Sequence, residues 1–265
     1  MLGLGTSLSS IYVPQASGYV NEYSAAFDGA NDYFNTGDPF TTTIKGSFTI
    51  SYWIKTTELN TGGDENHFGT FSVSGAMSYF ELQTRPTGHL RLNFKGMSGP
   101  SGAWITDSAV LDTTNGTDGN WMHIGVVVNR PGSGNISAKI YINGSEVAVT
   151  NSTTMDIAAQ ASFDNSPVPL TFAALKVASG STVLYHMSCS MDEIAIWNAS
   201  LSDASMAVVG NGVFDLTSGS GDYAQQGDLV SYYKFTEGSG TSVEDATGNN
   251  DGTLVNGASF DASTP

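Results

Sequence analysis

The stretch "SFTISYWIK" (Ser47–Lys55) alternates between two kinds of side chain. Every second position carries a large apolar residue, namely Phe48, Ile50, Tyr52 and Ile54. Successive side chains of a β-strand point to opposite faces, so these four residues share one face. The stretch therefore predicts a strand that packs one face on a hydrophobic core.

Similar short runs follow along the chain, separated by glycines and polar residues. "NWMHIGVVVNR" (Asn120–Arg130) is almost continuously apolar, as expected of a central strand buried on both faces. "AKIYINGSEVAV" contains Asn143-Gly144, a pair that suits a type I′ hairpin turn. One helical signal occurs in "LSDASMAVVGNG", where Ser202 can cap the first turn and the glycines end the helix. The pattern predicts an all-β protein, an antiparallel jelly-roll β-sandwich with one short helix.

Composition agrees with this class and excludes two kinds of partner. The 265 residues are 40% hydrophobic and 13% charged, with 31 glycines, which favours many short strands and turns. A net charge of −16 repels nucleic-acid phosphates and anionic lipid surfaces, so neither is an expected partner. Cys189 is the only cysteine, so no intrachain disulfide can form, and a buried thiol is expected.

The first residues of the sequence, "MLGLGTSLSSIYVPQ", carry neither a basic segment nor a long apolar one. This start is not typical of a secretory signal, so synthesis in the cytoplasm is expected. Residues 1–20 are small and polar and are predicted to form an N-terminal arm. Residues 21–265 show no shift in composition and are predicted to form one domain.

The hydrophobic alternation slips in "SMDEIAIW". Met191 is out of phase with Ile194 and Ile196, so one extra residue lies around Asp192–Glu193. A β-bulge there would restore the register. Alternatively, Asp192 points inward beside the two isoleucines and then requires a partner.

Five internal segments and a closing one resemble the laminin G-like branch of the concanavalin A-like lectin/glucanase superfamily. They are "AAFDGANDYFNTG" (Ala25–Gly37), "GSFTISYWIKT" (Gly46–Thr56), "NWMHIGVVVN" (Asn120–Asn129), "IYINGSEV" (Ile140–Val147), "MDEIAIWNASLSD" (Met191–Asp203) and "LVSYYKFTEGSGTSVEDATGNNDGTLVNGASF" (Leu229–Phe260). In many relatives the closing segment precedes the "FDG" strand, whereas here it comes last. Alternation within it predicts that it folds back into the same sandwich rather than forming a linker.

The resemblance implies one structural Ca²⁺, because members of this superfamily often bind calcium near the sandwich edge. Candidate ligands are Asp245, Asn249 and Asp251, joined by Asp28 or Asp192. The alternative is that Asp and Asn occupy this stretch for turn formation, since their side chains bond nearby backbone.

The resemblance also raises glycoside hydrolysis, which requires two carboxyl groups on one face. The Glu-x-Asp-x-x-Glu pattern of the family's hydrolases is missing, and Asp192 and Glu193 are expected to point to opposite faces. No catalytic residue is predicted, and the protein is expected not to be an enzyme. For glycan binding, Trp104 is the expected exposed aromatic, with Asn66 and His67 supplied by a polar loop.

Two functions are compatible with these features. The small-residue arm and lone laminin G-like domain look like phage structural proteins, which implies a non-enzymatic decoration or fibre-like subunit on the virion surface. Its partners would be neighbouring subunits in an assembly or homo-oligomer, with weak binding of neutral glycans. The alternative is a carbohydrate-binding, lectin-like adhesion module.

Overall fold

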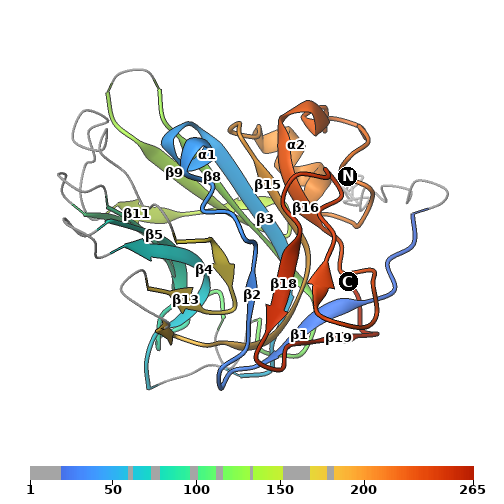
Figure 1. Cartoon of the computed structure of the whole chain (residues 1–265). Helices are drawn as coiled ribbons and strands as arrows, with labels where there is room; N and C mark the ends of the chain where they lie inside the picture. The colour runs from blue at the N-terminus through green and yellow to red at the C-terminus, as the bar shows by residue number, and fades with distance from the viewer. Residues whose placement is uncertain are drawn as a thin grey trace, which may run out of the picture.

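The computed structural model describes residues 19–58, 62–72, 78–95, 101–111, 116–131, 134–151, 168–177 and 182–265. Two antiparallel sheets face each other across a hydrophobic core (Figure 1). The predicted sandwich of antiparallel sheets is confirmed. The arm, residues 1–20, lies almost wholly outside the described residues, so the domain limits stay a prediction.

Sheet A has eight strands, with β10, β9, β8, β3, β15, β1 and β19 in spatial order and β16 also paired to β15. Their bounds are β1 Ser24–Asp28, β3 Phe48–Lys55, β8 Met122–Asn129, β9 Ser137–Ile142, β10 Ser145–Val147, β15 Ser188–Trp197, β16 Leu229–Tyr233 and β19 Ser259–Asp261. Strand β8 lies between β3 and β9 and is buried along nearly its whole length, as its apolar sequence predicts.

Sheet B has nine strands in the order β11, β7, β6, β5, β4, β12, β2, β18 and β17. Their bounds are β2 Tyr33–Asn35, β4 Glu65–Ser72, β5 Ser78–Thr84, β6 Leu90–Lys95, β7 Gly102–Thr106, β11 Val149–Asn151, β12 Thr171–Phe172, β17 Ser242–Val243 and β18 Gly252–Val255. A separate two-stranded ribbon joins β13 (Leu175–Lys176) to β14 (Val183–Leu184).

The closing segment lies inside both sheets. Strand β18 pairs with β2, β19 pairs with β1, and β16 pairs with β15. Figure 1 shows the red C-terminal strands beside the blue N-terminal ones. The prediction that residues 229–260 fold back into the sandwich is therefore confirmed.

Two predicted local features are also confirmed. Asn143 and Gly144 both have positive φ values, 47° and 74°, as a type I′ turn between β9 and β10 requires. The pairing of β15 with β3 shifts register between Asp192 and Ala195, and Glu193 has φ 52°, which marks the expected bulge.

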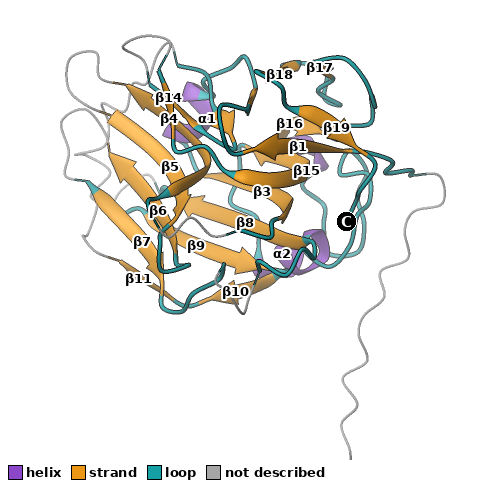
Figure 2. Ribbon diagram, turned by 90° about the horizontal axis from the view of Figure 1, so that it is seen from below, coloured by secondary structure: helices purple, strands orange, loops and turns teal. Residues whose placement is uncertain are grey.

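Helix α2 (Asp203–Val209) covers the outer face of sheet A, beside β9 and β10 in Figure 2. The Ser202 hydroxyl accepts a hydrogen bond from the backbone N–H of Ser205 at 3.1 Å, so the predicted cap is confirmed. Met206 and Val209 pack with Trp197 in a second apolar cluster, separate from the core between the sheets. A second short helix, α1 (Thr41–Lys45), was not predicted, because its five residues carry no periodic apolar pattern. A 3₁₀ turn, η2 (Gln226–Asp228), precedes β16.

Cys189 is buried, as predicted, and burial raises the pKa of its thiol. No helix in the described residues combines the length and the apolar character needed to cross a lipid bilayer.

Candidate functional site

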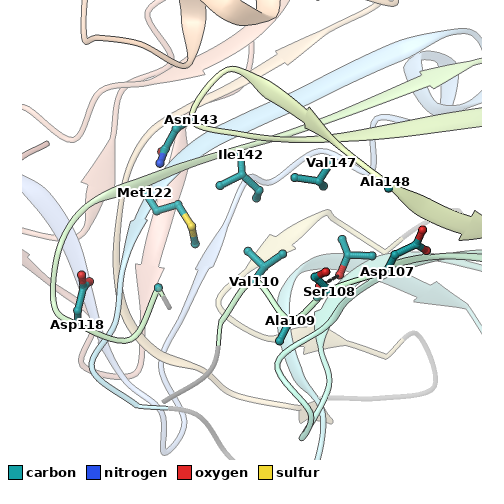
Figure 3. A pocket seen from close by; sticks show the side chains of 12 residues that line it. Asp107, Ser108, Ala109, Val110, Asp118, Met122, Ile142, Asn143, Val147 and Ala148 are labelled. Atoms are coloured by element: carbon teal, nitrogen blue, oxygen red, sulfur yellow. Dashed lines mark hydrogen bonds between the residues drawn. The ribbon is translucent and has the colours of Figure 1, made fainter. Parts of the chain in front are cut away.

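A pocket of about 560 Å³ opens at the edge of the sandwich, between the last strands of the two sheets (Figure 3). From sheet B it receives the end of β7 and the loop that follows, and from sheet A it receives β8, β9 and β10. We call it the edge pocket. Its described lining consists of Thr106, Asp107, Ser108, Ala109, Val110, Gly116, Asp118, Met122, Ile142, Asn143, Val147 and Ala148.

Backbone hydrogen bonds hold the two walls of the edge pocket together. The loop after β7 is fixed where the N–H groups of Val110 and Leu111 donate to the carbonyl of Gly88, at 2.8 and 3.0 Å. The N–H of Asp107 donates to the carbonyl of Ala148 at 2.9 Å, which ties this loop to the segment after β10. The pocket is therefore built on strand ends and not on loop side chains alone.

The floor of the edge pocket is aliphatic and its rim is polar. Val110, Met122 and Ile142 point inward in Figure 3, with Asp118 at one end and Asp107 at the other. Hydrogen bonds from the backbone and side-chain amides of Asn120 lower the pKa of Asp118, so its carboxylate is charged at neutral pH. No lysine, arginine or histidine belongs to the described lining.

A second polar surface lies on the outer face of sheet B. Strands β5 and β6 turn Leu82 and Leu92 into the core, so the alternate side chains point outward. We call the outward cluster the sheet B patch; its members are Asp64, Glu81, Gln83, Arg91 and Asn93.

Hydrogen bonds connect all members of the sheet B patch. Arg91 Nη2 donates to Asp64 Oδ2 and to Gln83 Oε1, both at 2.5 Å, and Asn93 Nδ2 donates to Glu81 Oε1 at 2.9 Å. Burial raises the pKa of Glu81, and its second carboxyl oxygen, Oε2, has no hydrogen-bond partner. Phe71 and Tyr79 stack beside the patch with ring centroids 5.6 Å apart.

The sequence profile of one protein family matches residues 28–207, and that family is described as the concanavalin A-like lectin/glucanases superfamily. The match covers more than half of the chain. The chain belongs to the concanavalin A-like lectin/glucanases superfamily. No curated protein sequence matches it.

Solved structures show that the superfamily fold is shared with carbohydrate-binding proteins. A candidate carbohydrate binding protein from Bacteroides ovatus superimposes with a TM-score of 0.59 at 20% identity, covering 91% of this chain and 60% of its own. The CBM40 of the Ruminococcus gnavus IT-sialidase, bound to alpha2,6 sialyllactose, superimposes with a TM-score of 0.51 at 16% identity, covering 71% of this chain and 95% of its own. The chain thus spans 60% of the length of the Bacteroides ovatus protein. At these identities the likeness shows the fold.

The calcium ligands inferred from the superfamily resemblance lie in a hydrogen-bonded turn. Asp245 is fully buried, and its Oδ1 accepts from the N–H groups of Tyr232 and Thr247 at 2.8 and 3.0 Å. Its Oδ2 accepts from Thr247 Oγ1 and from the N–H of Asn250, at 2.9 and 3.0 Å. Asp251 accepts from the N–H of Asp245. Four donors occupy the carboxylate that a cation would need, so the site fits turn formation better than a calcium shell.

The other proposed ligands have protein partners of their own. Asn249 donates to Thr247 Oγ1 at 3.0 Å, and Asp28 accepts from the N–H of Ala30 at 2.8 Å. Asp192 is buried and accepts from the N–H of Glu193 and from Asn21. Within the described parts of the chain, no group of three or more His, Cys, Asp and Glu side chains is placed to hold a metal ion.

Calcium binding stays a prediction of the superfamily resemblance, which the hydrogen bonds at Asp245 do not favour, and a melting experiment tests it. Because Asp245 is already saturated by donors, we expect the same melting temperature in CaCl₂ and in EDTA. A bound ion at one hundred times its Kd would add about 2.7 kcal/mol of stability, which a thermal scan detects easily. A lower melting temperature in EDTA would contradict our expectation and support the calcium prediction.

The three residues proposed for glycan binding are buried. Trp104 is 3% exposed, because it lies in β7 opposite Leu92 and faces the core, so the predicted exposed aromatic is wrong. Asn66 and His67 lie in β4 and not in a polar loop. The His67 ring bonds Tyr52 Oη at 2.8 Å and Thr84 Oγ1 at 2.5 Å, and burial lowers its pKa to about 3. All three are buried in this structure and cannot meet a sugar from solvent.

The expected orientation of Asp192 and Glu193 is also wrong. The bulge inserts one extra residue into β15 and shifts its register with β3. Both carboxyl groups therefore lie on the outer side of sheet A, while the side chains of Met191 and Ile194 stay in the core. Both acidic residues are buried, with exposures of 0% and 4%. They therefore form a pair, but one enclosed by protein and not open to a substrate.

Sequence reasoning missed the edge pocket because its lining comes from strand ends that are distant in the chain. The Asn143-Gly144 turn beside it was predicted, yet a turn signal says nothing about the cavity that it borders. The outward alternation of Glu81 and Gln83 with Leu82 was the one available signal for the sheet B patch.

Proposed function

We propose that this chain is a non-catalytic carbohydrate-binding module and that a sugar ring binds in the edge pocket. The observation that carries the proposal is the amphipathic lining of a pocket of about 560 Å³. Ligand pockets of about 300–1,000 Å³ combine apolar walls with a few placed polar groups. A sugar has the same division, with C–H groups on its ring faces and hydroxyls at its edge. The superfamily fold, shared with carbohydrate-binding proteins, supports this assignment.

Charge on the rim of the edge pocket favours neutral glycans. Asp107 and Asp118 contribute two carboxylates, and no basic residue of the described lining offsets them. The chain as a whole has a net charge of −16 at pH 7. We therefore propose neutral sugars as ligands and expect glycans that carry a carboxylate to bind more weakly.

The non-catalytic part of the proposal is supported by the placement of the rim carboxylates. Figure 3 shows Asp107 and Asp118 at opposite ends of the edge pocket, with Val110 and Ile142 between them. A glycosidase needs two carboxyl groups that flank one glycosidic bond, and two carboxylates at opposite ends of a pocket are not such a pair. The virion-surface role stays a prediction; the relatives support the carbohydrate-binding alternative.

Binding to immobilised neutral and sialylated oligosaccharides, measured by biolayer interferometry, tests the proposal. Val147→Trp fills the edge pocket and is expected to weaken binding of neutral glycans at least tenfold. Glu146→Trp is the matched control, because it adds the same ring to the adjacent, exposed position of β10, outside the pocket lining. Its binding should stay within twofold of wild type.

The sheet B patch provides the competing location. If Glu81→Gln abolishes binding and Val147→Trp does not, the sugar lies on the patch and the pocket assignment is wrong. If no neutral glycan binds the wild-type chain at millimolar concentration, the proposed function itself fails.

A further inference from the structure

Two adjacent carboxyl groups lie buried against the outer face of sheet A. Asp192 is 0% and Glu193 is 4% exposed, and the bulge at Glu193 places both on the same side. Burying one carboxylate is costly unless hydrogen bonds or opposite charges compensate it, and two neighbouring carboxylates also repel each other. The arrangement therefore depends on the groups that surround it.

The N-terminal segment supplies two of the donors that satisfy this pair. Tyr19 Oη donates to Glu193 Oε1, and Asn21 Nδ2 donates to Asp192 Oδ2 at 2.9 Å. A third donor, Tyr232 Oη of β16, bonds Glu193 Oε2. Tyr19 and Asn21 precede β1, so the pair fastens the entry of the chain onto sheet A across more than 170 residues of sequence.

One described cation faces the pair. Lys234 Nζ lies 5.6 Å from the ring centroid of Tyr19 and 5.7 Å from that of Tyr232. Burial has the largest effect and raises the pKa of Glu193, whereas the hydrogen bonds from Tyr19 and Tyr232 lower it and the attraction of Lys234 lowers it further. Lys234 Nζ also forms an ion pair with Asp215 Oδ2 at 3.6 Å. The titratable and charged groups around the pair are Tyr19, His123, Asp215, Tyr232 and Lys234.

His123 does not add a second positive charge. Its ring lines the same small cavity as Glu193, both ring nitrogens lack hydrogen-bond partners, and burial lowers its pKa to about 3. The ring is therefore neutral at physiological pH. Among the described residues, Lys234 is the one cation near the pair, and it also pairs with Asp215. When both carboxyl groups are ionised, their two negative charges are therefore not balanced by positive charge.

We propose that Asp192 and Glu193 form a proton-sensitive latch, which holds the segment Tyr19–Tyr23 on sheet A while the pair keeps a proton and loosens it when both carboxyls ionise. The proposal is independent of glycan binding at the edge pocket. The latch gives the segment Tyr19–Tyr23 two states, held on sheet A or released from it, and a change of pH near neutrality shifts the balance between them.

The direction of the pH effect follows from proton linkage. Burial raises the pKa of Glu193 to about 7, and burial together with the charge of Glu193 raises the pKa of Asp192 well above its ordinary value. In the unfolded chain both groups titrate near pH 4. The folded protein therefore binds more protons than the unfolded one between about pH 4 and 7, so this contribution to stability is complete at acid pH and is lost as the pH rises through 7.

Melting temperatures between pH 5 and 8.5, together with cleavage by chymotrypsin, test the latch. Chymotrypsin cuts after tyrosine, so cleavage at Tyr19 and Tyr23 reports release of the segment once the rate is corrected with a model peptide at each pH. We expect the wild-type melting temperature to fall by several degrees from pH 5.5 to 8.5 and cleavage to rise at least fivefold. Asn21→Ala should raise cleavage at pH 5.5 as well, because it removes one fastening bond.

Glu193→Gln and Asp192→Asn separate the latch from general repulsion in an acidic protein. Each variant removes one ionisable group and keeps a similar shape, so each should flatten both pH profiles. Asp222→Ala, which removes an exposed carboxylate elsewhere, should leave them unchanged. The latch is overturned if wild-type cleavage does not rise with pH, or if both pair variants retain the wild-type pH dependence.

Discussion

Replacing Asp245 with alanine should lower the free energy of unfolding by about 3–5 kcal/mol. The carboxylate accepts four hydrogen bonds, three of them from backbone N–H groups of Tyr232, Thr247 and Asn250. Each buried donor left without a partner costs about 1–3 kcal/mol, and part of that cost is recovered when water enters. The change would detach the turn after β17 from β16, which is where the closing segment joins sheet A.

Urea unfolding followed by tryptophan fluorescence measures this loss. Asp222→Ala is the control, because Asp222 is exposed, and a surface substitution changes stability by no more than about 0.5 kcal/mol. The stability loss of Asp245→Asn should lie between those of Asp245→Ala and Asp222→Ala. The amide keeps one acceptor oxygen but turns an NH₂ group toward the N–H of Asn250. A loss below about 1 kcal/mol for Asp245→Ala would show that the hydrogen-bonded turn does not hold the segment.

Gly210→Ala should destabilise the protein by about 2 kcal/mol or more, although a methyl group is the smallest possible addition. A Cβ at Gly210 would lie 2.5 Å from Gly144 Cα and 2.9 Å from His123 Nδ1. Gly144 belongs to the β9–β10 turn, whose backbone cannot rotate away as a flexible side chain can. Overpacking of this kind costs about 1–3 kcal/mol and would push the end of α2 off sheet A.

Gly212→Ala is the matched control for this prediction. No atom lies within 4 Å of the Cβ that it would add, and its backbone is not in the left-handed region. Replacing such a glycine stabilises a protein by about 0.4–1 kcal/mol, because the unfolded chain loses freedom. Thermal melting of the two variants should therefore show shifts of opposite sign. Equal shifts would mean that the contact between α2 and the Asn143-Gly144 turn is looser than the structure places it.

Features with a local physical cause could be read from the sequence. Alternation along Ser47–Lys55 requires a strand with one buried face, and Asn143-Gly144 tolerates the positive φ values of a tight hairpin. The two-residue alternation of apolar side chains is interrupted between Met191 and Ile194, which predicts one extra residue in the strand, and the bulge supplies it. These signals depend on neighbours in the chain, so a single sequence contains them.

The candidate glycan residues show where such reading stops. Trp104 has loop-like residues on its N-terminal side, yet β7 pairs with β6 and the ring enters the core. Asn66 and His67 follow an acidic, glycine-rich stretch, yet β4 already includes them and a bulge turns His67 inward to Tyr52. Exposure depends on which strand pairs with which, and the local composition does not report that pairing.

The sequence by itself determined the class of the fold, the hairpin turn, the capped helix and the return of the last segment into the sandwich. Each rests on periodicity or on backbone conformation, which act over a few residues. Only the tertiary structure decided the edge pocket, the saturation of Asp245 and the meeting of Tyr19 with Glu193. These arrangements join groups from distant parts of the chain, and their energies depend on burial and distance, which exist only after the sheets have packed.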